Sequence, residues 1–181
     1  MEKLKYIKVT AKNLDIAYQI QANEWPSDKD YENFVETAKL NDAKNINFIV
    51  YCGKRPIGIT GVYTEENDKR TMWLNWYCVV PEERGKGYGR QILLDTIEYC
   101  KKFDDIDYFR IDTSFNIKRA SSRLYLQVMD IIEKYTAEDD ENYKSGNYIC
   151  SKRLKDDIDY IPWNNRNLHL REYYSKCKGL V

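Results

Sequence analysis

The apolar and polar positions of this 181-residue chain predict alternating strands and helices. Segments rich in alternating, β-branched or aromatic residues predict strands, at 6–10, 47–52, 57–64, 71–80, 108–114, 131–136 and 148–154. Apolar residues at helical spacing predict helices, at 14–24, from Ser27 to about Leu40, at 92–103 and 117–129, with a further helical stretch around 168–174. The order strand, helix, helix, three strands, helix predicts a mixed α/β domain.

The stretch 79–103 carries the strongest chemical signal. An apolar strand runs into Pro81, which cannot continue a central strand, and Gly85, Gly87 and Gly89 precede a helix. The first N–H groups of that helix have no intrahelical acceptor and lie at the positive end of its dipole. Glycines let an anion approach the backbone, and neighbouring basic residues add positive charge. The stretch therefore predicts a site for a pyrophosphate group.

The spacing of the glycines distinguishes between pyrophosphate ligands. It does not match the dinucleotide pattern G-x-G-x-x-G, because the third glycine comes one residue early, and no G-x-x-x-x-G-K-[ST] string occurs. The string Arg84-Gly85-Lys86-Gly87-Tyr88-Gly89 matches R-x-x-G-x-G instead. Preceded by an apolar strand that ends in Val-Pro-Glu and followed by an amphipathic helix, it resembles the coenzyme A site of the GNAT superfamily of N-acyltransferases.

This resemblance implies a fold and a set of cofactor contacts. The fold would be α/β (α+β), with a mixed, mostly antiparallel central sheet of about six or seven strands and about four flanking helices. It would span residues 1–154, and 155–181 would form a C-terminal extension. Acetyl-CoA would be the cosubstrate, with its pantetheine on strand backbone and its pyrophosphate in the glycine loop. The implied cofactor-binding residues are Cys78, Val79, Val80, Arg84, Gly85, Lys86, Gly87, Tyr88, Gly89, Arg90 and Asn116.

Acetyl transfer to an amine needs a base for the ammonium proton and an acid for the leaving thiolate. The resemblance implies Tyr125 as the acid, although Lys118 and Ser121 stand where the family's helix motif has Asn and Ala. The apolar helix stripe around Tyr125 keeps a buried core tyrosine open as the alternative. The strand segment 73–76 has no carboxylate, so Asp112 is the best candidate for the base, with a salt-bridge role as its alternative.

Composition excludes several other classes of protein. The 29 basic and 29 acidic residues cancel, which argues against a nucleic acid or a membrane held by bulk charge. The five cysteines lack a C-x-x-C pair, so we expect reduced core thiols and no metal site. Glu82 and Glu83 are expected to be solvated. The N-terminus has no apolar leader and no segment approaches about 18 apolar residues, so a cytoplasmic protein is expected.

The hypothesis is direct transfer of an acetyl group from acetyl-CoA to a primary amine of a small molecule or peptide, because no cysteine is an obvious acyl carrier. A non-catalytic acyl-CoA-binding regulatory module on the same fold is the alternative, and a nucleotide-binding module ranks below both. No motif identifies the amine. The aromatic-rich extension is expected to pack on its own domain or on a second subunit of a homodimer.

Overall fold

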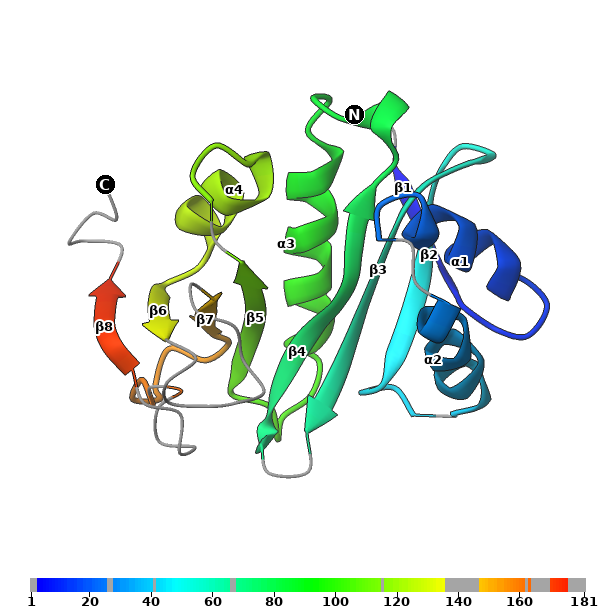
Figure 1. Ribbon diagram of the computed structural model, residues 1–181. Helices are drawn as coiled ribbons and strands as arrows, with labels where there is room; N and C mark the ends of the chain where they lie inside the picture. Colours follow the sequence, from blue (N-terminus) through cyan, green and yellow to red (C-terminus); the bar gives the residue numbers. More distant parts are fainter. Residues whose placement is uncertain are drawn as a thin grey trace. The chain divides into compact units, whose positions relative to one another are not determined.

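The computed structural model describes residues 3–25, 28–40, 42–65, 68–114, 116–135, 147–161, 163 and 170–175. Figure 1 shows the elements, which are β1 (Leu4–Lys8), α1 (Leu14–Ala22), α2 (Asp28–Lys39), β2 (Ile46–Cys52), β3 (Arg55–Glu65), β4 (Asp68–Val79), the 3-10 helix η1 (Pro81–Glu83), α3 (Tyr88–Cys100), β5 (Tyr108–Ser114), α4 (Ala120–Val128), β6 (Ile131–Tyr135), β7 (Asn147–Arg153) and β8 (Leu170–Ser175). The predicted order of elements is confirmed as far as β7. Seven strands of the described chain lie within 1–154, as predicted.

The prediction of a helix around 168–174 is wrong. Within the described residues, Leu170–Ser175 form strand β8, which pairs antiparallel with β6. The free backbone groups along an edge of β6 can be satisfied by a further strand, which favours this pairing over an isolated helical turn. The predicted strand end at Thr136 and the cysteine at 177 lie outside the described residues, whereas the other four cysteines are buried free thiols.

The chain forms two compact units, Met1–Asn67 with Leu74–Tyr99, and Asp68–Trp73 with Cys100–Val181. In the first unit the strand order is β1-β2-β3-β4, and β1–β2 and β2–β3 are antiparallel. Helices α1 and α2 pack on one face of these strands, in a core cluster of Val9, Leu14, Ala17, Ile20, Phe34, Ile49, Ile59 and Cys78. Helix α3 packs on the opposite face, in a cluster of Val50, Cys52, Ile57, Val79 and Ile92. Neighbouring residues of a strand point to opposite faces, as Ile49 and Val50 do on β2. A register shift in the β2–β3 pairing allows Ile57 and Ile59 of β3 to lie in different clusters.

In the second unit the strand order is β4-β5-β7-β6-β8. Strands β4 and β5 are parallel, and Thr71–Trp73 pair with Tyr108–Arg110. Strand β7 pairs antiparallel with both β5 and β6. The second unit therefore contains one parallel pair in an otherwise antiparallel sheet, as the mixed-sheet prediction required.

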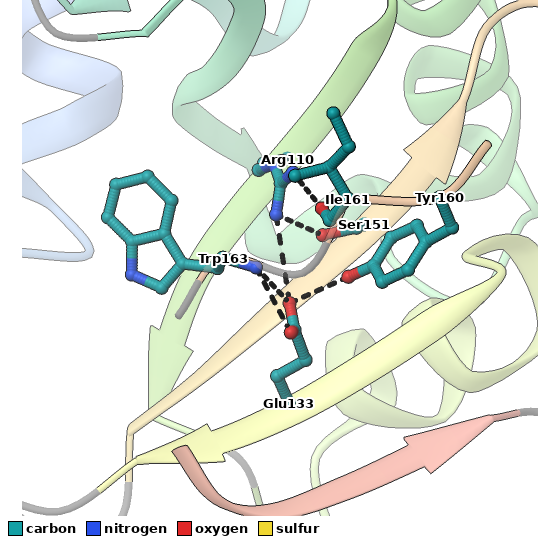
Figure 2. A network of polar contacts seen from close by, with 6 residues as sticks. All are labelled: Arg110, Glu133, Ser151, Tyr160, Ile161 and Trp163. Carbon is teal, nitrogen blue, oxygen red and sulfur yellow. Dashed lines mark hydrogen bonds and ion pairs between the residues drawn. The ribbon is translucent and has the colours of Figure 1, made fainter. Parts of the chain in front are cut away.

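A buried ion pair links two strands of the second unit (Figure 2). The guanidinium of Arg110 on β5 lies 3.7 Å from a carboxylate oxygen of Glu133 on β6, and the two side chains are 3% and 0% exposed. Arg110 also donates a hydrogen bond to Ser151 Oγ on β7, at 3.1 Å. Burial raises the pKa of Glu133, against the lowering effects of its hydrogen bonds and of Arg110. The stability of this buried pair therefore depends on the hydrogen bonds that surround it.

Residues that follow β7 complete this network (Figure 2). The Tyr160 hydroxyl and the Trp163 backbone N–H donate to the buried carboxylate at 2.7 and 3.1 Å. The Ile161 carbonyl accepts from the guanidinium at 2.7 Å. The Trp163 ring meets the ring of Trp73 edge-on, with centroids 4.7 Å apart. Residues 160, 161 and 163 thus pack on the strands of the second unit.

Candidate functional site

The glycine loop joins η1 to α3 in the first unit. Gly85 and Gly87 have φ values of 75° and 86°, which residues with a Cβ rarely adopt. The Gln91 N–H donates to Gly87 O at 3.2 Å, at the start of the α3 hydrogen-bond ladder. The N–H groups of the preceding turn therefore have no acceptor within the helix. The loop has the backbone conformation of an anion site at a helix N-terminus.

A close contact fixes the other end of this loop. The Tyr77 hydroxyl donates to Gly89 O at 2.6 Å, and a Cβ at Gly89 would lie 3.0 Å from that hydroxyl. A side chain at position 89 would therefore press on the Tyr77 hydroxyl between β4 and α3, whereas a Cβ at Gly85 would meet open space. The three glycines have different roles, and the two with positive φ shape the anion site.

Glu83 is buried, so the expectation that it is solvated is wrong. Its carboxylate accepts from Arg55 at 2.9 Å and from Lys86 at 2.9 Å, and its side chain is 5% exposed. The hydrogen bond from Lys86 is the main cause that holds the pKa of Glu83 below its usual range, with a further contribution from Arg55. Glu83 thus ties the glycine loop to the start of β3. A carboxylate followed three residues later by a lysine was the available sequence signal.

This arrangement predicts an acid-sensitive loop. A carboxyl group with a lowered folded-state pKa stabilises the fold above its ordinary value of 4.5, and this stability is lost as the pH falls through the folded-state pKa. We expect the melting temperature of Glu83→Gln to fall less steeply than that of wild type as the pH is lowered below 4.5. Glu82→Gln, which changes an exposed neighbour, should have the wild-type slope. Thermal melts across this pH range measure both. Equal slopes for wild type and Glu83→Gln would contradict the prediction.

Arg84, predicted to hold the pyrophosphate, has two partners in the structure. Its Nε donates to Val79 O at 2.9 Å, and its terminal nitrogen forms an ion pair with Glu24, just beyond the end of α1. The guanidinium is 49% exposed and the Glu24 side chain 23%. The sequence analysis missed Glu24, because no local pattern relates residues that are 60 positions apart.

Cys78 and Val79 form the end of β4, and Val80 connects this strand to η1. The Val80 N–H is already bonded to Ile57 O, at 2.9 Å. This interaction leaves Val80 N–H less suited to a cofactor amide than the prediction assumed. Trp76, just upstream, has a φ of 44°, which is an uncommon conformation for a bulky residue and changes the direction of the strand before this segment.

Burial determines the chemistry of the Cys78 thiol. Cys78 lies in the core cluster that β4 forms with α1 and α2. Desolvation is the main cause that raises its pKa to about 12, and the charge of Glu24 acts in the same direction. The thiolate is the nucleophilic form of cysteine. Cys78 therefore remains a protonated thiol at neutral pH, which makes it unsuitable as an acyl carrier.

The second unit contains three of the predicted site residues, Tyr125, Asp112 and Asn116. Tyr125 on α4 is 5% exposed, so its burial is compatible with both the acid role and the core role considered above. Asp112 is exposed on β5. Asn116 stabilises the turn before α4, because its Oδ1 accepts from the Lys118 N–H at 2.9 Å and its own N–H donates to Ser122 Oγ at 3.0 Å.

The described residues fit an anionic, phosphate-bearing ligand. Two glycines with positive φ, the N-terminus of α3 and the basic side chains of the loop lie together on the first unit. No group of three or more His, Cys, Asp or Glu side chains in the described ranges could hold a metal ion. None of the helices in those ranges combines the length and apolarity that crossing a bilayer requires.

A family model described as the acetyltransferase (GNAT) family matches residues 13–130, and a comparison with curated proteins finds no significant match. Among solved structures, an acetyltransferase from Bacillus subtilis in complex with CoA has a TM-score of 0.63 at 18% identity, over 86% of this chain and 100% of the other. A GNAT family acetyltransferase from Elizabethkingia anophelis with acetyl-CoA bound has a TM-score of 0.59 at 17% identity, over 84% and 99%. A spermidine/spermine N-acetyltransferase from Vibrio cholerae, studied in mutant forms, has a TM-score of 0.64 at 14% identity, over 83% and 94%. At these identities the likeness concerns the fold, and it confirms the predicted fold class.

Proposed function

The chain belongs to the GNAT family of acetyltransferases, and on that premise we propose that it transfers the acetyl group of acetyl-CoA to a primary amine. The observation that carries this proposal is the glycine loop, with positive φ at Gly85 and Gly87 immediately before α3. The structures of similar fold from Bacillus subtilis and Elizabethkingia anophelis contain CoA and acetyl-CoA, respectively. We propose the same ligand for this loop.

In this proposal the residues of the first unit bind and orient the cosubstrate. The amides from Gly85 to Arg90 receive the pyrophosphate at the positive end of α3. The backbone of Cys78 and Val79 aligns the pantetheine. Acetyl-CoA supplies an acetyl group that is activated as a thioester. Because the Cys78 thiol is buried and protonated, the acceptor amine attacks directly.

We assign the proton transfers to Asp112 and Tyr125. An amine attacks only as the neutral base, so Asp112, exposed on β5, or a water next to it takes the ammonium proton. The new C–N bond forms as the C–S bond breaks, and the Tyr125 hydroxyl donates a proton to the leaving sulfur. The proton that the acylated nitrogen then loses restores the Tyr125 hydroxyl through water. The role of Tyr125 rests on its partial match to the family's helix motif, and Asp112 is proposed as the base because the strand segment 73–76 has no carboxylate.

We expect Tyr125→Phe to lower kcat by about 10²- to 10⁴-fold, the usual contribution of a positioned proton donor, with little change in the affinity for acetyl-CoA. An amine-library acetylation assay identifies the acceptor, and the kinetics of wild type and variant are then compared. Tyr99→Phe, which also removes a hydrogen-bonding hydroxyl, is the matched control. An unchanged kcat in Tyr125→Phe would assign this tyrosine to the core.

The incomplete tyrosine motif and the lack of a carboxylate in the strand segment 73–76 motivate one alternative, a non-catalytic acyl-CoA-binding regulatory module. Calorimetry with acetyl-CoA and the amine library together separate the two functions. Binding with no acetylated amine supports the module, and acetylation supports the enzyme. We further propose that the acceptor is an amine of a small molecule or peptide and that the acetyltransferase domain spans 1–154. We also propose a cytoplasmic location and a homodimer.

A further inference from the structure

The charge of Arg84 is neutralised inside the proposed cofactor site. Its Nε is held on Val79 O at 2.9 Å, and its terminal nitrogen is ion-paired with Glu24. Glu24 and Arg84 also act in opposite directions on the pKa of Cys78, which places both charges near that end of β4. The Glu24 carboxylate therefore lies beside the strand segment proposed to bind the pantetheine.

The hydrogen bond of Arg84 Nε to Val79 O limits which anions the terminal N–H groups of the guanidinium can bind. Arginine presents its donors in a rigid planar fork, so a guanidinium anchored at Nε offers its terminal N–H groups to one neighbouring anion in the best geometry. In the structure that anion is Glu24. A pyrophosphate bound at the adjacent amides would bring a second anion to the same donors.

We propose that Glu24 is a built-in competitor for the cofactor, so that the pyrophosphate takes Arg84 from Glu24 when the loop is loaded. This inference rests on the proposed function of the glycine loop. The exchange makes Glu24 a residue that tunes cofactor affinity, and it links occupancy of the loop to the charge at the end of α1. Because the pair is partly exposed, the competition is modest.

The change in CoA affinity on replacing Glu24 tests whether the pyrophosphate takes Arg84 from Glu24. We expect Glu24→Gln to bind CoA about two- to fivefold more tightly than wild type, the range of an exposed ion pair, and Arg84→Gln to bind it more weakly. In the Arg84→Gln background, Glu24→Gln should give no further gain, because no arginine remains to compete for. Calorimetric titration with CoA measures all four proteins, and thermal melts verify that each is folded.

Asp15→Asn is the matched control, since Asp15 is an exposed carboxylate in the first turn of α1 and accepts a hydrogen bond from Tyr31. Its affinity for CoA should equal that of wild type. Weaker or unchanged binding by Glu24→Gln would overturn the exchange, as would an equal gain in the Arg84→Gln background, which would indicate simple charge repulsion. Failure of the wild-type protein to bind CoA would instead overturn the proposed function and this inference with it.

Discussion

Glu133→Gln is expected to lower the free energy of unfolding by about 3–5 kcal/mol, the usual cost of removing one partner of a buried ion pair. The Arg110 guanidinium would remain 3% exposed with no opposite charge. The Tyr160 and Trp163 groups that donate to the carboxylate would also face a weaker acceptor. Urea denaturation followed by circular dichroism measures the change.

The control for this variant is Asp130→Asn, whose carboxylate pairs with Lys152 at 3.0 Å but is 34% exposed. Its expected cost is under about 1 kcal/mol. A double variant, Arg110→Met with Glu133→Leu, removes both charges and should recover much of the loss, because apolar replacements of buried pairs are often neutral or stabilising. A loss below about 1 kcal/mol in Glu133→Gln would show that the pair does not hold this unit together.

Gly87→Glu is expected to weaken CoA binding at least about 100-fold, because a carboxylate within about 4 Å of a phosphate costs several kcal/mol at a protein surface. The new side chain would also be strained at a φ of 86°. Calorimetric titration of wild type and variant with acetyl-CoA, and with NAD as a competing nucleotide, measures the effect and its specificity.

Gly53→Glu is the matched control for backbone strain and added charge. Gly53 has a φ of 59° in the turn between β2 and β3, and a Cβ there would have no atom within 4 Å. This variant should have a similar cost in stability and should bind acetyl-CoA normally. Equal binding by wild type and Gly87→Glu would assign the glycine loop to a plain turn.

Most of the fold could be predicted because its elements are short and strongly patterned. The alternation over 108–114 defines β5 at the same bounds in the structure. The same alternation could not show that Arg110 is buried, since a charged residue in a strand usually faces solvent. Its burial depends on Glu133 and on Ile161, whose carbonyl is supplied 51 positions further along the chain. Local periodicity contains no information about such contacts.

The candidate site likewise has parts that the sequence indicated and contacts that it could not show. The sequence identified Gly85 and Gly87 as the residues that shape the loop, and both have positive φ in the structure. The anion site that their spacing indicates stays a prediction. The partners of the charged residues were not predictable, because Glu83 and Arg55 meet only when η1 lies beside the start of β3. A helical pattern around 168–174 was also overridden, since pairing with β6 depends on an edge that only the folded sheet provides.

The edge-on contact between Trp73 and Trp163 has an optical consequence. Two indole rings with centroids 4.7 Å apart and planes at 79° are close enough for their electronic transitions to mix. Such coupling gives a pair of circular dichroism bands of opposite sign, and these vanish when the rings separate. The protein therefore carries an intrinsic spectroscopic label that reports, without added dye, whether the chain beyond β7 is seated on the second unit.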